Sequence, residues 1–233
     1  MNLALLTAAG CGSRVGGATP KQFVSVNGMP VIVHTMRAFQ YHPEIDVICV
    51  VTLPEWVDVV AEYGRQYGIT KLRHIVVGGA SGQESIKRGL DELHSVYADD
   101  DIVLVHDGVR PMVSAEIISD CIRCVRANGN AIAAIPCTEA ILQTTDGGVS
   151  AVTSIPRDAL RRTQTPHGFY LGDIWAAQND ALACGITNTV ACCTLMVALG
   201  RRVFFSRGAE QNLKLTTVAD FEIFRALLGR VTK

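Results

Sequence analysis

The sequence predicts a single α/β domain built on a mostly parallel sheet. Short apolar runs, of the kind that buried parallel strands need, alternate with segments of helical period. The chain of 233 residues is long enough for one such domain, and its 48% hydrophobic and 18% charged content suits a well-buried core. Neither an internal repeat nor a linker divides it, so we expect one domain over residues 1–233.

Strands and helices alternate regularly in the first half of the chain. The first buried strand runs over Leu3–Leu6. Pro30 and Pro54 stand where proline favours a helix start, and Ser81 or Ser85 is placed to cap a helix. The expected elements that follow are a helix over Val31–Phe39, a strand over Asp46–Thr52, a helix from Pro54 to Tyr67, a strand over His74–Val77, a helix reaching Leu90 and a strand over Ile102–Val105.

After one more helix and strand, the regular alternation of strands and helices ends in the second half of the chain. The expected elements are a helix over Ser114–Asn128 closed by Gly129, a strand over Ala131–Ile135, a helix over Leu171–Cys184, a helix over Thr189–Leu199, a strand over Arg202–Ser206 and a terminal helix over Asp220–Leu228. Between them, residues 137–163 form what we call the arm, with strands Ala140–Thr144 and Val149–Ile155 joined at Asp146–Gly147. A two-stranded hairpin is marginally stable alone, so we expect the arm to pack on a second copy in a homodimer.

Composition and charge exclude several classes of protein. The net charge is −1, so no global basic field is available for nucleic acid. No stretch approaches the roughly 20 apolar residues of a membrane span, and the N-terminus lacks a basic region, so a cytoplasmic protein with no membrane partner is expected. The eight cysteines then read as small buried side chains, including the CxxC pair Cys121 and Cys124 within a helical pattern.

A glycine-rich stretch, Leu3–Phe23, is the strongest functional signal. The first strand opens into a loop with Gly10, Gly12, Gly16 and Gly17, where backbone N–H groups can approach an anion closely. Arg14 and Lys21 add two cations, and no acidic residue precedes Glu44. This stretch predicts a cradle for a triphosphate.

Two better-known phosphate loops do not fit this stretch. The dinucleotide pattern needs a third glycine where Val15 stands, and the acidic ribose anchor about 20 residues on is missing. The P-loop pattern fails because Ala18 occupies the lysine position. An ordinary strand-to-helix turn that tolerates glycine is the plain alternative.

Further candidate residues follow later strands. Gly78 and Gly79 precede Ser85, a setting in which a planar ligand could lie against backbone; a plain strand-to-helix loop is the alternative. Asp107 follows a strand at the sheet edge where ligands bind in open α/β folds, and can hold Mg²⁺ or a ligand hydroxyl. Arg110 can pair with Asp107 or with a phosphate, and a local ion pair is the plain alternative.

Five motifs occur together in a recognisable order: AAGCGSR with PKQF, GGASGQESI, VHDGVRP, TQTPHGF and NLKLTT. In this order and spacing they resemble the cytidylyltransferases that activate sugar-alcohol phosphates, namely the methylerythritol-phosphate enzymes of isoprenoid synthesis and the ribitol-phosphate enzymes of teichoic-acid and capsule synthesis. The resemblance covers essentially the whole chain. It implies a Rossmann-like, glycosyltransferase-A-type fold, CTP as donor, Mg²⁺ as cofactor and a homodimer locked by the arm.

The resemblance also assigns roles to residues. Arg14, Lys21, Lys214 and, from across the dimer, Arg157 would be the catalytic cations. Asp107 would hold the polyol phosphate or the metal, and Arg110, Arg157 and Thr165 would contact the acceptor. The residues that would bind the nucleotide are Ala8, Ala9, Gly10, Gly12, Gly79, Ala80 and Ser85.

The chain departs from the family pattern at three places. Gly82, beside the base, stands where the family commonly has Arg; on the acceptor side, Ala140 replaces a Thr of the arm and Ala191 falls in a segment that usually carries an Asp. The acceptor-side changes argue against 2-C-methyl-D-erythritol 4-phosphate, and the neighbourhoods of Pro54-Glu55-Trp56 and NLKLTT resemble the ribitol-phosphate branch. The favoured acceptor is therefore ribitol 5-phosphate, or a related pentitol or pentulose phosphate, with 2-C-methyl-D-erythritol 4-phosphate as the alternative. A dinucleotide-dependent oxidoreductase and a non-catalytic nucleotide-binding protein are the competing classes.

Overall fold

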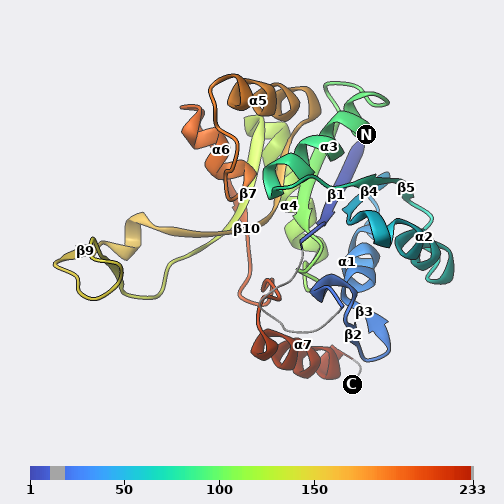
Figure 1. Ribbon diagram of the computed structural model, residues 1–233, viewed down its shortest axis with the longest axis horizontal. Coiled ribbons are helices and arrows are strands. Elements are labelled where there is room, and N and C mark those ends of the chain that lie inside the picture. Colours follow the sequence, from blue (N-terminus) through green and yellow to red (C-terminus); the bar gives the residue numbers. More distant parts are fainter. Residues whose placement is uncertain (11–18, 232–233) are drawn as a thin grey trace.

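A seven-stranded sheet forms the centre of the computed structural model, which describes residues 1–10 and 19–231 (Figure 1). The strand order is β11-β7-β10-β6-β1-β4-β5, and all neighbours are parallel except β10, which runs antiparallel to both β6 and β7. This arrangement confirms the predicted α/β fold with a mostly parallel sheet. The strands are β1 (Asn2–Ala8), β4 (Val47–Thr52), β5 (Leu72–Val77), β6 (Ile102–Asp107), β7 (Asn130–Pro136), β10 (Arg161–Tyr170) and β11 (Phe205–Arg207).

Helices cover both faces of this sheet because alternate residues of the central strands point to opposite sides. In β1, Ala4 and Leu6 belong to one buried cluster, and Leu3 and Leu5 belong to the other. The first cluster joins the sheet to α1 (Val31–Gln40), α2 (Val57–Gln66) and α4 (Ala115–Asn128). The second joins it to α3 (Gly82–His94), α5 (Leu171–Ala183) and α6 (Cys192–Ala198).

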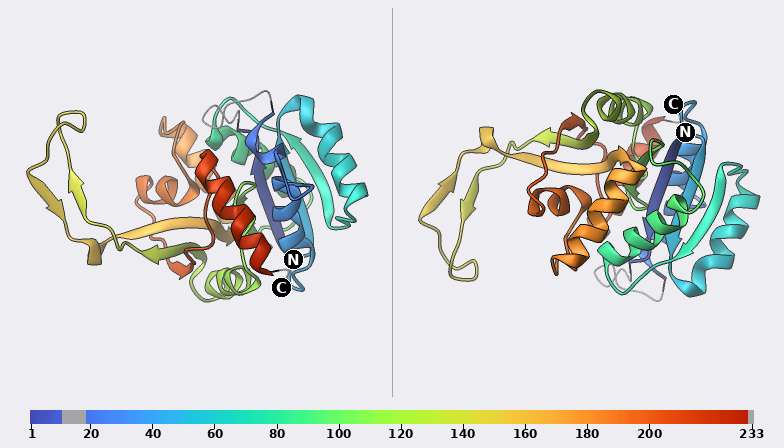
Figure 2. Two further views of the ribbon diagram at one scale, coloured as in Figure 1. Left: turned by 90° about the horizontal axis from the view of Figure 1, so that it is seen from below. Right: turned by 90° about the horizontal axis from the view of Figure 1, so that it is seen from above.

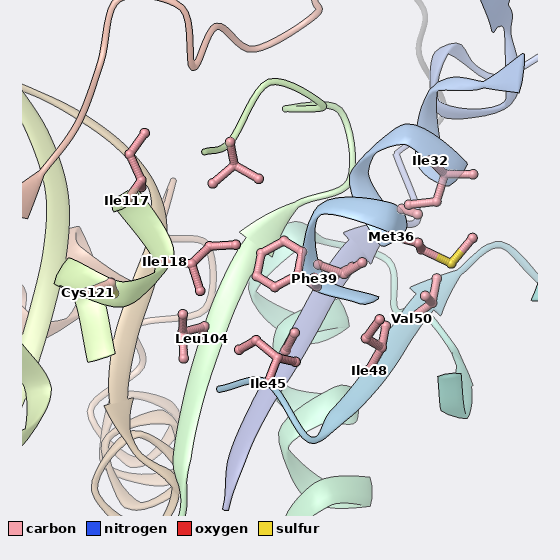
Figure 3. Close-up of a cluster of buried hydrophobic side chains, with 14 of the residues drawn as sticks. Ile32, Met36, Phe39, Ile45, Ile48, Val50, Leu104, Ile117, Ile118 and Cys121 are labelled. Atoms are coloured by element: carbon pink, nitrogen blue, oxygen red, sulfur yellow. The ribbon is translucent and has the colours of Figure 1, made fainter. Parts of the chain in front are cut away.

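Figure 3 shows the first cluster, in which Phe39 of α1 and Ile118 of α4 meet over Leu104 of β6. The buried side chains are large and fully removed from solvent, so the sheet is held rigidly from this side. A third cluster packs α7 (Val218–Val231) against the short strand β2 (Ser25–Val26) and the start of α1 through Phe221, Phe224 and Val26. The short strand β3 (Met29–Pro30) pairs with β2.

The helix caps follow the sequence closely. Ser81 accepts a hydrogen bond from the Glu84 N–H at the start of α3, and Ser114 does the same for Ile117 at the start of α4. Gly129 closes α4 in the left-handed conformation that glycine favours. Short 3₁₀ turns at Lys21–Phe23, Pro54–Trp56 and Arg157–Ala159 complete the elements. The helix expected from Thr189 begins only at Cys192, and the late strand lies a few residues further along than expected.

Strand β10 is the main element that the sequence did not predict. No strand is expected from the sequence over residues Gln164–Phe169, where Pro166 argues locally against one. The structure accommodates Pro166 where the register between β10 and β7 shifts, between Thr163 and His167. As a result, β10 runs beside β6 and carries Thr165 to the end of that strand.

The arm projects away from the body of the domain (Figure 2). Its strands β8 (Ile141–Gln143) and β9 (Thr153–Ile155) pair in antiparallel fashion and form a sheet of their own. The connection between them is wider than the tight turn expected at Asp146–Gly147: the Asp146 carboxylate accepts hydrogen bonds from the N–H groups of Val149 and Ser150. Val149 is 87% and Val152 100% exposed, so in the single chain the arm has little apolar burial.

In the described part of the chain, no helix has the length and apolar character that crossing a membrane requires.

Candidate active site

Two adjoining cavities open beyond the carboxyl ends of the central strands, where α/β sheets bind their ligands. The larger cavity, of about 460 Å³, lies over the ends of β1 and β6 and the loop before α3. The smaller cavity, of about 160 Å³, lies between β6, β10 and the start of α6. Both are lined by Thr7, Ile86, Asp107, Val190 and Lys214.

The larger cavity is bounded mostly by backbone and small side chains. Ala8, Ala9 and Gly10 follow one another from the end of β1, and a Cβ atom added at Gly10 would meet no atom of residues 1–10 and 19–231 within 4 Å. Packing within the described chain therefore does not require glycine at this position, as expected where a ligand approaches the backbone. The buried Gln22 fixes the loop, because its Nε2 donates to the carbonyl oxygens of Ala8 (2.7 Å) and Gly10 (3.0 Å).

The opposite wall of the larger cavity is the loop before α3. The N–H of Gly79 donates to Ser85 Oγ (3.0 Å), and the N–H of Ala80 donates to Glu84 Oε2 (2.8 Å). Arg88 holds the loop from the helix, since it donates to the Gly78 carbonyl (2.9 Å) and to Glu84 Oε1 (2.7 Å). The N–H groups of Gly79 and Ala80 are thus satisfied within the chain, while the carbonyl oxygens of the loop, with two lone pairs each, can still accept hydrogen bonds from a ligand.

Glycine is required sterically at this loop. A Cβ atom at Gly78 would lie 2.4 Å from the Ala9 side chain, and one at Gly79 would lie 2.3 Å from that of Glu84. At Gly82 there is open space, so the arginine common at this position in the family would fit. Hydrogen bonds from Ala80 and Arg88 lower the pKa of the Glu84 carboxyl, so Glu84 stays ionised while it holds the loop.

Asp107 lies at the boundary between the two cavities. Its Oδ2 pairs with Arg110 Nε at 2.8 Å and its Oδ1 pairs with Lys214 Nζ at 3.0 Å. Burial alone would raise the pKa of this carboxyl, but Lys214 and Arg110 hold it well below its usual range. Arg110 also donates to the Asn212 carbonyl (2.8 Å), so the end of β6 and the segment that carries Lys214 are fixed together.

The smaller cavity is lined by side chains rather than backbone. His106 Nε2 lies 3.1 Å from the Arg110 carbonyl oxygen and its Nδ1 lies 3.0 Å from Thr165 Oγ1. The N–H of Asp107 also donates to Thr165 Oγ1 at 3.0 Å. Burial lowers the pKa of His106 to about 4, so the ring is neutral near pH 7. His167, which is buried on β10, lines the same cavity.

The structure brings most of the predicted residues together. Lys21 lines the larger cavity with Ala8, Ala9, Gly10, Gly79, Ala80 and Ser85, while Arg110 and Thr165 line the smaller one. Gly12 and Arg14 lie outside the described residues. Arg157 is exposed on the arm, where it donates to the Thr138 carbonyl (3.3 Å), and lines neither cavity of its own chain.

Several site residues were missed from the sequence. Gln22 lies within the PKQF motif and Glu84 within GGASGQESI, so position in a motif was the signal that could have found them. His106 and His167 each stand alone in a strand and give no pattern. Their place in the site depends on β10 running beside β6, with His167 opposite Val105.

The donor set limits how a metal could bind. Among the residues that the structure describes, no group of three or more His, Cys, Asp or Glu side chains could hold a metal ion. Asp107 is the one carboxylate among the described residues that line the two cavities. Mg²⁺ commonly binds through one or two carboxylates together with substrate phosphates, so these residues fit a nucleotide-borne Mg²⁺ rather than an all-protein site.

Comparisons with known proteins point to one family. A family model described as 2-C-methyl-D-erythritol 4-phosphate cytidylyltransferase matches residues 2–230. A ribitol-5-phosphate cytidylyltransferase of Streptococcus agalactiae is 36% identical over 229 residues, which cover 97% of this chain and 95% of that protein. A 2-C-methyl-D-erythritol 4-phosphate cytidylyltransferase of Geobacter metallireducens is 34% identical over 226 residues, which cover 97% and 96%.

A solved structure shares the fold. The 4-diphosphocytidyl-2C-methyl-D-erythritol synthase of Anaerococcus prevotii superposes with a TM-score of 0.83 at 26% identity, covering 98% of this chain and 96% of that one. The likeness therefore extends over both cavities and the arm.

Proposed function

Because the chain belongs to the 2-C-methyl-D-erythritol 4-phosphate cytidylyltransferase family, we propose that it transfers CMP from CTP to ribitol 5-phosphate, or to a related pentose-derived phosphate. As a member of this family it is a nucleotidyltransferase. The observation that carries the proposal is the meeting of a backbone-lined cavity and a side-chain-lined cavity at Asp107 and Lys214. Such a junction suits two anionic substrates that must be held end to end.

CTP would occupy the larger cavity with its base against the loop before α3. The carbonyl oxygens that this loop presents can accept hydrogen bonds from the exocyclic amino group of cytosine, whereas uracil has a carbonyl at that place. A hydrogen-bonding site rejects such an analogue strongly because its own groups are left unpaired. We therefore expect kcat/KM for CTP to exceed that for UTP, and equal values would contradict this assignment of the base.

The reaction needs positioning more than acid–base chemistry. An oxygen of the acceptor phosphate would attack the α-phosphorus of CTP in line, forming one P–O bond as the bond to the bridging oxygen breaks and pyrophosphate leaves with the electron pair. The attacking phosphate is already ionised, so no general base is required. Lys214 stands where both cavities meet and Lys21 lines the nucleotide side, which places cations around the charge that develops.

Mg²⁺ would be held by Asp107 together with oxygens of the triphosphate, and when bound it would neutralise charge on the phosphates. Ionised Asp107 also orients Lys214 and Arg110 in the present structure. The same carboxylate thus keeps two cations at the junction of the cavities before either substrate binds. These cations would reduce the electrostatic repulsion between the two phosphates that must meet there.

The choice of acceptor rests on the relatives and on the acceptor side of the site. The relatives named for ribitol 5-phosphate are 35–36% identical to this chain and those named for methylerythritol phosphate 34%. Ala191, one of the departures from the family pattern, lines the smaller cavity. The deciding experiment is pyrophosphate release from CTP with ribitol 5-phosphate, methylerythritol 4-phosphate, xylulose 5-phosphate and glycerol 3-phosphate. Preference for methylerythritol 4-phosphate would show that it, and not ribitol 5-phosphate, is the acceptor.

We also propose a homodimer in which the arm completes the neighbour's site. The exposed apolar side chains of the arm, among them Leu142 at 63% exposure, support a covering partner, and Arg157 lies outside both cavities of its own chain. Mixing Arg157→Ala with Lys21→Ala subunits tests this, because each mixed dimer would regain one intact site. After random exchange, about a quarter of wild-type activity should return; no recovery after demonstrated exchange, or a monomer by light scattering, would contradict it.

The cytoplasm is the compartment we propose for this activity. The seven cysteines that the structure describes are all free thiols, as a reducing compartment favours.

A further inference from the structure

A buried glutamine of α3 holds the segment that leads into the wall shared by the two cavities. Gln83 is 3% exposed and lines neither cavity. Its Nε2 donates to the Ile186 carbonyl oxygen at 2.7 Å, and its Oε1 accepts from the Thr189 N–H at 2.8 Å and from the Thr189 hydroxyl at 3.1 Å. A carbonyl can only accept and a backbone N–H can only donate, so these partners fix the orientation of the amide.

The held segment, residues 186–189, is irregular and has few other ties. Ile186 packs against the second buried cluster, and its N–H donates to the Ala181 carbonyl at 2.8 Å. Among residues 1–10 and 19–231, the hydrogen bonds that reach residues 187–190 are the two between Thr189 and Gln83. The path of the chain between Ile186 and the start of α6 therefore depends on this one side chain.

Val190 follows the held segment directly and lines both cavities, as Lys214 does. Because Val190 is 95% exposed, substrates that meet at this wall would remove much of its apolar surface from water, which is favourable. An apolar group over the phosphates also keeps water away from them, and charges attract more strongly where water is excluded. The position of Val190 therefore bears on how firmly Lys214 holds the phosphates that meet there.

The first turn of α3 supports both sides of the site. Gln83, Glu84 and Ser85 are consecutive, and the last two accept hydrogen bonds from the N–H groups of the loop before α3. Gln83 holds the segment before Val190 from the same turn. One helical turn thus fixes the nucleotide loop and the shared wall relative to each other.

We propose that Gln83 is a positioning residue for the transfer reaction: it holds residues 186–189 so that Val190 closes the junction over the two substrates. The inference rests on the proposed function and adds to it a residue that touches neither substrate. Its effect should fall mainly on the acceptor, because Val190, Ala191 and Cys192 all line the smaller cavity. The nucleotide loop keeps its own supports in Glu84 and Ser85.

Gln83→Met tests the proposal, since methionine has nearly the same length but makes none of the three hydrogen bonds. At saturating CTP, kcat/KM for ribitol 5-phosphate should fall about 10-fold, while KM for CTP stays within about three-fold of wild type. Hydrogen–deuterium exchange of residues 186–191 should become about 10-fold faster, because opening of this segment would no longer break these bonds.

Val190→Ala shows whether Gln83 acts through the shared wall. This variant alone should lower kcat/KM for ribitol 5-phosphate about five-fold, because less apolar surface covers the substrates. In the Val190→Ala background, Gln83→Met should then cost less than about three-fold, since residues that act through one another are not additive. A purely structural glutamine would give losses that multiply.

Gln40→Met is the matched control. Gln40 ends α1 outside both cavities and also ties a helix to a loop: its Nε2 donates to Thr70 Oγ1 at 2.9 Å, and its Oε1 accepts from the Lys71 N–H at 2.9 Å. Its replacement removes a similar set of hydrogen bonds and should leave both kinetic constants at their wild-type values.

Wild-type kinetics in folded Gln83→Met would overturn the proposal, as would a loss that multiplies with that of Val190→Ala. If Gln83→Met does not fold, Thr189→Val takes its place in the same cycle, because it removes the 3.1 Å contact alone. A loss of about two-fold that disappears in the Val190→Ala background then supports the proposal, and no loss overturns it.

Failure of the proposed function would look different, because it would appear in the wild-type enzyme. If the wild-type enzyme does not use ribitol 5-phosphate, the cycle is run on whichever phosphate of the acceptor panel it does use, and the same two patterns decide. If no acceptor of the panel releases pyrophosphate from CTP, the proposed function and the role of Gln83 are both wrong.

Discussion

The two cavities of the site are built by different means. The larger one is formed by the course of the backbone at Gly10 and Gly79, with N–H groups of its second loop satisfied by Ser85 and Glu84. The smaller one is formed by side chains, chiefly His106, Thr165 and His167. Recognition through backbone depends on the path of the chain, whereas recognition through side chains can change one residue at a time. With CTP in the larger cavity and the acceptor in the smaller one, as we propose, the acceptor side is the part of the site that single substitutions can change most easily.

Strand direction explains this difference. On the nucleotide side, β1 and β4 are parallel neighbours and each ends at the same edge, so what reaches a ligand is the loop that follows the strand. On the acceptor side, β10 runs antiparallel to β6, and its own residues lie beside the end of β6. A strand that passes through the site contributes side chains directly, while a strand that ends there contributes a turn.

The two lysines of the site, Lys214 at the junction and Lys21 in the larger cavity, should give the largest effects. Lys21→Ala and Lys214→Ala are each expected to lower kcat by about 10²–10³-fold with the fold intact, since each removes one preorganised charge contact to phosphate. Both variants should affect all nucleotides and acceptors alike, because Lys214 lines both cavities and Lys21 the nucleotide side. Steady-state pyrophosphate release, with circular dichroism for the fold, measures this.

Lys87→Ala is the matched control, since Lys87 pairs with Asp91 at 2.5 Å and lies over the Trp175 ring of α5, outside both cavities. It should turn over at the wild-type rate. Near-normal turnover by either junction variant would remove that lysine from the catalytic machinery.

The side-chain cavity should also show itself in the pH dependence of stability. His106 and His167 have an ordinary pKa of 6.5 when unfolded and about 4 when folded, because burial disfavours their charged form. The unfolded state therefore binds more protons between these values. Stability is complete above about pH 6.5 and falls as the pH drops toward 4, by about 1.4 kcal/mol per pH unit for each histidine.

Urea unfolding at about pH 7.5, 6 and 5 measures that slope, and His167→Gln should reduce it by the share of one histidine. Burial also lowers the pKa of His34, which adds to the slope with the same sign in both proteins and so cancels in the difference. A free energy of unfolding that stays constant over this range in the wild-type protein would show that the two rings are not held neutral by the fold.

Gly10→Ala probes the backbone-lined cavity. A Cβ atom there meets no atom of the described residues within 4 Å, so the melting temperature should stay within about one degree of wild type. The added methyl group enters the space of the nucleotide, and KM for CTP should rise about 10-fold. A stable variant with unchanged KM would mean that CTP does not approach this part of the loop.

Ser85→Ala should give the smallest effect. It removes the oxygen that accepts the Gly79 N–H (3.0 Å) and donates to the Ser81 carbonyl (2.9 Å), which loosens the base-reading loop without removing it. The loss of about 1 kcal/mol predicts a rise of about five-fold in KM for CTP and a smaller CTP preference over UTP. Ser95→Ala, at the other end of α3, serves as the control because its hydroxyl only donates to the Glu92 carbonyl.

Much of the fold was predictable because local chemistry and tertiary structure agree. The apolar runs became β1, β4 and β6, and Ser114 and Gly129 begin and end α4 as their residue types favour. Strand β10 was not predictable, since Pro166 argues locally against a strand and only pairing with both β6 and β7 outweighs it.

The residues of the site show the same contrast between local signals and contacts made only in the folded chain. Asp107, Ser85 and Lys214 were identified because they follow strand ends or glycines, and the structure places them on the cavities. His106 and His167 gave no signal because their roles arise from contacts between β6 and β10, segments far apart in the sequence. The role of Arg157 stays a prediction that the mixed-dimer experiment decides.

The passage of β10 through the acceptor side has a practical consequence for redesign. Residues 163–167 form one short segment that carries Thr163, Thr165 and His167 into the cavity. Gln164 and Thr165 also bond to Ala209, Asn212 and Asp107, so these two residues support the chain on either side of Lys214 and must be kept. A combinatorial library confined to codons 163 and 167 would therefore sample new acceptor chemistries while Asp107 and Lys214 stay in place, and it offers a route to a different CDP-linked product.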